Sequence, residues 1–92
     1  MPKKTDAEIL ANYLDGERIK AIPSKRSRKL LVLAWLVQRF ERARDYTEAE
    51  VNELIKRSHP DFATLRRELY DAYLMDRHDG IYRRCENSAE RR

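Results

Sequence analysis

The sequence predicts a small α+β domain that is mainly helical, and three features of its second half carry this prediction. Thr47–Glu50 is a capping box, in which a threonine is followed three residues later by glutamate, so a helix begins there. Asp61 begins another helix directly after the break at His59–Pro60. Gly80 provides the turn of a hairpin near the end of the chain. Two helices joined by a short turn and followed by a hairpin outline a winged helix, a fold that mostly binds nucleic acid.

Length and composition indicate one domain without a membrane segment or a disulfide. The 92 residues form a single domain, of which we expect 5–84 to fold and 85–92 to be a frayed tail. No apolar run approaches the ~20 residues of a membrane span, and Met1–Asp6 lacks the apolar core of a secretory signal. Cys85 is the only cysteine, so no internal disulfide is possible and a cytoplasmic location is expected.

The first part of the chain predicts a helix and a short strand. Thr5 and Glu8 form a capping box, and the helix that they open should end at Asp15–Gly16. Residues 17–22 alternate between polar and apolar side chains, as an exposed edge strand does, and Pro23 stops the strand.

The central helix should be the most buried one. Ser24 or Ser27 can cap it, and the pattern runs to about Arg42. Leu30–Val37 is apolar nearly all round, which is typical of a helix that is covered on most sides. We therefore place Trp35, together with the later Phe40, in the core.

Apolar spacing then defines the two helices and the hairpin of the second half. Asp45–Tyr46 is a short link that can add one ladder pair to a small sheet. Residues 73–77 and 81–84 should be the hairpin strands, joined by a three-residue loop. The residues expected to face the core from the two helices are Val51, Leu54, Ile55, Phe62, Leu65, Leu69 and either Ala72 or Tyr73.

The net charge is +4, and the positive charge is concentrated in two places. Arg39, Arg42 and Arg44 suit the C-terminal end of the central helix, where the helix dipole favours cations. Four cations lie instead at its N-terminal end, where the dipole disfavours them, and this indicates an anionic partner. They are Lys25, Arg26, Arg28 and Lys29. The hairpin and its exit carry a second basic group, which consists of Arg77, His78, Arg83 and Arg84.

The third helix of the core is the one that reads the major groove in a winged helix. With Leu65 and Leu69 inward, Thr64 and Arg67 face outward, where Arg67 could pair with guanine. Arg66 lies at the edge of the apolar stripe and should instead pair with Glu50, Glu53 or Glu68 and brace the fold, an alternative that is also open to Arg67. Asp71 and Glu68 make this helix nearly neutral. The candidate contacts with nucleic acid are Lys25, Arg26, Arg28, Lys29, Thr64, Arg67, Arg77, His78, Arg83 and Arg84. The two basic groups form one surface only if the fold brings them to the same side.

The reactive residues predict neither catalysis nor a cofactor. The serines, histidines and Cys85 are scattered, and none stands in a recognisable triad or nucleophile elbow. The spacing of His59, His78 and Cys85 with Asp61 or Asp79 matches no standard zinc pattern.

Several motifs together resemble the bacterial family catalogued as Domain of Unknown Function 2087. They are Ile22-Pro23-Ser24-Lys25, Leu31-Val32-Leu33, Tyr46 to Asn52, Asp61, Leu65 to Leu69, and Met75-Asp76-Arg77 with Gly80-Ile81-Tyr82. The resemblance covers roughly residues 10–84. It implies a winged-helix-like shape and a regulatory context, because some members follow a repressor-type DNA-binding domain, and it implies no catalytic residues. Tyr73 departs from the family, which often has glycine there, so the tightness of that turn is open.

Two functional hypotheses follow, from different classes. The first is a non-enzymatic nucleic-acid-binding or transcription-regulatory module that holds phosphates through the basic groups. The alternative is a protein-interaction or homodimerisation module on the same scaffold, which the near-neutral third helix favours. A ligand- or metal-sensing domain is the least supported idea.

Overall fold

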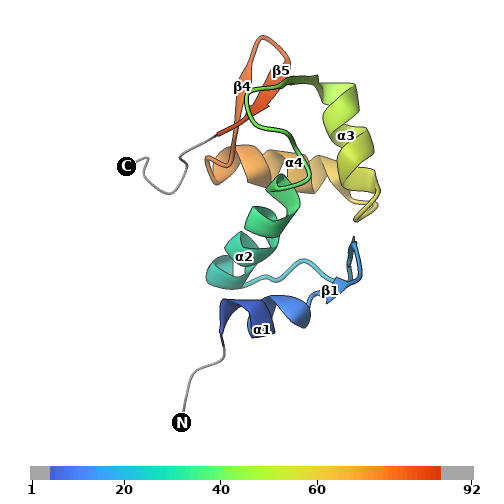
Figure 1. Ribbon diagram of the computed structural model, residues 1–92, viewed down its shortest axis with the longest axis vertical. Coiled ribbons are helices and arrows are strands. Elements are labelled where there is room, and N and C mark those ends of the chain that lie inside the picture. The colour runs from blue at the N-terminus through green and yellow to red at the C-terminus, as the bar shows by residue number, and fades with distance from the viewer. Residues whose placement is uncertain (1–4, 86–92) are drawn as a thin grey trace.

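A computed structural model describes residues 5–85, which form an α+β fold with four helices and two small antiparallel sheets (Figure 1). The elements in chain order are α1 (Asp6–Ala11), β1 (Leu14–Asp15), β2 (Arg18–Ile19), α2 (Arg26–Val37), β3 (Asp45–Thr47), α3 (Glu48–Lys56), α4 (Phe62–Asp71), β4 (Met75–His78) and β5 (Ile81–Arg84). The predicted α+β class is thereby confirmed.

The N-terminal segment forms a short helix and a small hairpin rather than a longer helix and a lone strand. Thr5 and Glu8 form the predicted capping box of α1. The helix ends at Ala11, however, and not at Asp15–Gly16. Gly16, with φ 65°, lies in the turn between β1 and β2, and this hairpin takes Leu14 and Asp15 out of the helix. An aspartate followed by glycine can end a helix or form the turn of a hairpin, and the local pattern does not distinguish these two structures.

The central helix α2 begins between the two predicted caps and ends earlier than predicted. Its N-cap is Lys25, which makes no side-chain capping bond, so neither Ser24 nor Ser27 caps it. The helix ends at Val37, and therefore Arg39, Arg42 and Arg44 lie beyond it instead of in its last turn. Its buried residues are Val32, Leu33, Leu36 and Val37, whereas Trp35 is only partly buried and packs against the edge of the core.

The C-terminal sheet has the strand order β3-β5-β4, with all pairs antiparallel. The link at Asp45–Tyr46 is thus a full strand that pairs with β5. The hairpin turn holds two residues, Asp79 and Gly80, with φ of 53° and 78°, because His78 pairs directly with Ile81. Two positive φ values are typical of a type I′ turn, so the predicted three-residue loop is wrong.

The core lies between this sheet and helices α2, α3 and α4. Tyr46, Met75 and Tyr82 are buried on the face of the sheet that meets the helices. The helices contribute the other large buried side chains, which are Leu33, Leu36, Val51, Ile55, Leu65 and Leu69. Cys85 is also buried, and its N–H donates to the carbonyl of Leu74 at 2.9 Å. Cys85, which was predicted to belong to the frayed tail, is therefore part of the packed structure, and the remaining residues of that prediction, 86–92, lie outside the described residues.

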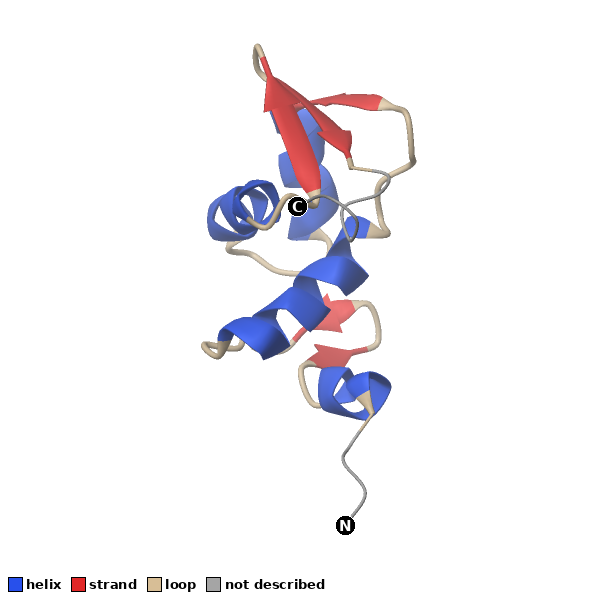
Figure 2. Ribbon diagram, turned by 90° about the vertical axis from the view of Figure 1, so that its left-hand side faces the viewer, coloured by secondary structure: helices blue, strands red, loops and turns tan. Residues whose placement is uncertain are grey.

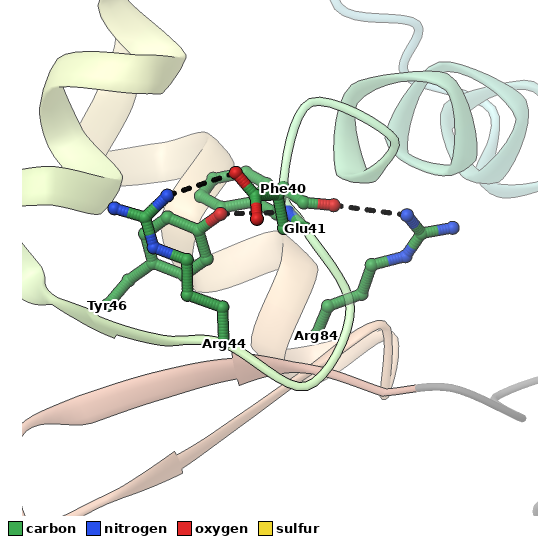
Figure 3. Close-up of polar contacts among 5 residues, drawn as sticks. All are labelled: Phe40, Glu41, Arg44, Tyr46 and Arg84. Carbon is green, nitrogen blue, oxygen red and sulfur yellow. Dashed lines mark hydrogen bonds and ion pairs between the residues drawn. The ribbon is translucent and has the colours of Figure 1, made fainter.

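The segment between α2 and β3 is anchored by Phe40 and its neighbours (Figure 3). The ring of Phe40 meets that of Tyr46 edge to face, with the centroids 5.1 Å apart. The Tyr46 hydroxyl accepts a hydrogen bond of 2.8 Å from the N–H of Glu41, and Arg84 Nη1 donates to the Phe40 carbonyl at 3.1 Å. These contacts fix the path by which the chain leaves α2 and enters the sheet.

The turn from α4 to the hairpin is tight although Tyr73 stands where glycine was expected. The N–H of Tyr73 donates to the carbonyl of Tyr70, and that of Leu74 to the carbonyl of Leu69, both at 3.0 Å. This pair of bonds is a Schellman motif, which requires a left-handed residue at the position of Tyr73. Tyr73 indeed has φ 62° and its side chain remains exposed.

We expect the substitution Tyr73→Gly to raise the free energy of unfolding by up to about 1 kcal/mol. Glycine removes the clash of a Cβ in the left-handed region, and the gain exceeds the extra entropy of the unfolded chain. Urea unfolding of the variant beside Tyr73→Ala, which loses the ring but keeps the strain, measures the effect. A clear loss of stability in Tyr73→Gly would contradict the prediction.

Candidate nucleic-acid interface

Helix α4 presents one apolar side to the core and one polar side to solvent. Asp61 caps it as predicted, with a bond from the N–H of Thr64 to the carboxylate, and Leu65 and Leu69 are fully buried. Thr64 and Arg67 are exposed on the other side. The Arg67 side chain is 84% exposed and lies 3.9 Å from Asp71, a contact that holds it only weakly. Both side chains are therefore available to a ligand.

Arg66 has a structural role, as predicted, but not with the predicted partners. Its guanidinium donates to the side-chain oxygen of Asn52 and lies 3.8 Å from Glu48. Both partners come from α3, so Arg66 fastens α4 to α3. We had expected Glu50, Glu53 or Glu68; Glu50 is instead used in the capping box of α3.

A cleft of about 380 Å³ separates α4 from the hairpin. Arg67 lines it from α4 and Arg77 from β4. Arg77 pairs with the buried Tyr82 in the ladder, so its side chain is on the face of the sheet that meets the helices. It makes no side-chain hydrogen bond or ion pair within residues 5–85. Two exposed guanidinium groups from different elements therefore border one cleft.

The other basic residues of the hairpin are engaged elsewhere. Arg83 donates to Asp45 at 2.8 Å on the opposite face of the sheet. His78 is next to Asp79 at 3.3 Å and borders the same outer hollow as Arg83. Arg84 is half-buried and bonded to the carbonyl of Phe40 (Figure 3). The fold thus brings Arg77 to the cleft with Arg67, and it does not bring these three there.

The N-terminal end of α2 carries cations that the fold leaves without partners. Lys25, Arg26 and Arg28 are exposed, and within residues 5–85 their side chains make no hydrogen bond or ion pair. The first turn of α2 contains no acidic residue and no side-chain cap. Lys29 differs, because its ammonium bonds to Glu68 of α4 at 3.1 Å and so joins the two helices. This end of α2 therefore concentrates positive charge that no carboxylate within residues 5–85 pairs with.

These elements lie along one side of the molecule. In Figure 2, α4 stands at the left edge, the hairpin rises above it and the N-terminal end of α2 lies below it. Figure 1 shows the same vertical order from the side. The N-terminal end of α2 and the strand that carries Arg77 are therefore separated by α4, and the three elements together border one surface. We call this surface the α4 face and define it by Lys25, Arg26, Arg28, Thr64, Arg67 and Arg77.

Sequence reasoning missed the partners that decide which cations are free. Asp45 and Arg83 are 38 residues apart and meet only because β3 pairs with β5. The contact of Lys29 with Glu68 likewise depends on how α2 packs on α4. The alternation of side chains along the hairpin could have placed Arg77 and Arg83 on opposite faces of the sheet. It could not have shown which of the two faces meets the helices.

No group of three histidine, cysteine or acidic side chains within residues 5–85 is arranged to hold a metal ion. Nor does any helix in the described part of the chain have the length and apolar character to span a membrane.

Comparison with known proteins gives one match. The model of a family described as "Uncharacterized protein conserved in bacteria (DUF2087)" matches residues 18–84, which is well over half of the chain and spans β2 to β5. No curated protein and no solved structure matches the chain.

Proposed function

We propose, for a chain that belongs to the DUF2087 family of bacterial proteins, that it is a nucleic-acid-binding module built as a winged helix. The topology supports this proposal. A helix, a strand, two helices and a hairpin follow one another, and the first strand pairs with the last one. In winged helices the helix before the hairpin enters the major groove. Here that helix is α4, whose solvent side is uncovered.

The observation that carries the proposal is the placement of unpaired cations on both sides of α4. The N-terminal end of α2, which carries Lys25, Arg26 and Arg28, lies on one side of α4, and the hairpin, which carries Arg77, lies on the other (Figure 2). Cations placed on both sides of a helix suit the two phosphate backbones that border a groove. In this arrangement Arg67 and Thr64 contact bases or phosphates in the groove, and the flanking cations fix the position of the protein along the duplex.

The near-neutral charge of α4 is consistent with an arrangement in which the flanking cations, and not α4, hold the phosphates. Asp71 and Glu68 offset the arginines of the helix, and Glu68 is already neutralised by Lys29. Nonspecific affinity then comes from the flanking cations, while α4 contributes shape and a few base contacts. The result is a module whose binding depends steeply on salt.

We expect fluorescence anisotropy of a labelled random duplex to show micromolar binding at low salt and a steep loss as salt rises. The double variant Arg67→Ala with Arg77→Ala should weaken that binding and lower the salt slope by about 2. The matched control is Arg44→Ala with Arg57→Ala. It removes the same charge from a hollow that is lined by α3 and the segment before β3.

Equal losses in the two double variants would mean that only the net charge matters and that the α4 face is not the binding surface. Absence of binding by the parent protein at low salt would overturn the proposal itself. The interaction-module alternative would then gain weight. That alternative predicts a molecular mass above that of the monomer, and the higher mass should persist at high salt because salt does not screen an apolar interface.

A further inference from the structure

Two exposed tyrosines stand together at the C-terminal end of α4. Tyr70 is 47% exposed and Tyr73 is 67% exposed, and both border one small hollow. They account for two of the three large hydrophobic residues that residues 5–85 leave exposed. Neither ring stacks on another ring or on a cation within the described part of the chain. Their rings therefore add little to the fold.

The backbone of Tyr73 adopts a strained conformation. Its φ of 62° lies in the left-handed region, which bulky side chains rarely adopt. The Schellman bonds of the turn impose that conformation, and glycine would satisfy them without strain. A strained residue whose ring is kept in solvent indicates that the ring is used for something other than stability.

The surroundings of the two rings favour a cation. Asp71 and Asp76 line the same hollow of about 250 Å³. The last turn of α4 contains no basic residue, so its partial negative charge is not offset by a cation of the helix. Arg67 reaches Asp71 only at 3.9 Å in a largely exposed pair, which neutralises little of that charge. Tyrosine faces attract guanidinium and ammonium groups, and carboxylates bind them directly.

The same surroundings make this hollow a poor place for nucleic acid, because the Asp71 carboxylate and the C-terminal end of a helix repel phosphates. We infer that the hollow formed by Tyr70, Asp71, Tyr73 and Asp76 is a docking site for an arginine- or lysine-bearing segment of a protein partner. The argument is charge complementarity: a planar guanidinium stacks on a tyrosine ring while its N–H groups meet a carboxylate. The site lies at the C-terminal end of α4, where Tyr70 and Asp71 also line the cleft that Arg67 and Arg77 border, and its existence does not depend on nucleic-acid binding.

The test is an amide NMR titration of the ¹⁵N-labelled full chain. The probe is an acetylated and amidated pentapeptide that contains two arginines. Its control is the same peptide with citrulline, which keeps the shape of arginine but has no charge. We expect saturable shifts of the amides of residues 70–76 with the arginine peptide and none with the citrulline peptide. The affinity should fall as salt is added, since the pair is exposed.

Two variants separate the ring from the fold. Tyr73→Gly keeps the turn, as argued above, and should raise the Kd of the arginine peptide roughly 2–5-fold. Tyr73→Phe retains a ring and should leave that Kd nearly unchanged. Equal binding of the two peptides, or an unchanged Kd in Tyr73→Gly, would overturn the inference. It would also be overturned by shifts confined to other elements. A dimer of the unliganded protein that Tyr73→Gly dissociates would overturn it too, because the occupant would then be a second copy of the chain.

Discussion

Replacing Lys25, Arg26 and Arg28 together with alanine should weaken the binding of duplex DNA on the order of 10²-fold at 0.1 M salt. Each cation that contacts a phosphate releases about one counterion, so the salt slope should also fall by about 3. The loss should be uniform across sequences, because these residues contact the backbone and not the bases. Fluorescence anisotropy over a salt series measures both quantities.

This triple variant should fold as well as the parent protein. The three side chains are exposed and make no bond within residues 5–85, and the helix dipole disfavours cations at that position. Lys29 is left in place because its bond to Glu68 holds α2 to α4. The matched control is Lys20→Ala, Arg44→Ala and Arg57→Ala, which removes one lysine and two arginines outside the α4 face. A salt slope equal to that of the parent would show that the end of α2 does not contact phosphate.

The substitution Phe40→Ala should lower the free energy of unfolding by about 3–5 kcal/mol. Phe40 is 1% exposed, its ring packs against that of Tyr46, and its removal leaves a cavity where α2 passes into the sheet (Figure 3). A domain has only about 5–15 kcal/mol in total, so the variant should be barely folded at 37 °C. Thermal unfolding followed by circular dichroism should show a Tm at least about 12 °C lower.

A control for this effect is Trp35→Ala. Trp35 is also a large aromatic residue, but it is only partly buried at the edge of the core, and the guanidinium of Arg39 lies 4.2 Å from the centroid of its ring. Because less of its surface leaves water on folding, its loss should cost less than that of Phe40. If Phe40→Ala were as stable as the parent, the packing of the segment between α2 and β3 would have to differ from that described above.

Local signals predicted the elements whose physical cause is local. The capping boxes at Thr5 and Thr47 and the cap at Asp61 were read correctly, because each is a bond between residues three apart. The stripe of Leu65 and Leu69 was also read correctly, since the helical period alone decides it. Turns were less certain. Asp15–Gly16 suited a helix end and a hairpin equally, and only pairing with Arg18 and Ile19 decided between them.

Composition, local motifs and their spacing were enough to predict the α+β class, the family and the presence of two basic groups. Which of those cations are free depends on contacts between distant parts of the chain. Arg83, Arg84 and Lys29 bond to Asp45, the Phe40 carbonyl and Glu68, and all three contacts join residues that are 38 to 44 positions apart. Such contacts arise from strand pairing and helix packing, which cannot be predicted from a local sequence pattern. The charges that remain unpaired, and the strained Tyr73 beside them, are therefore properties of the folded chain.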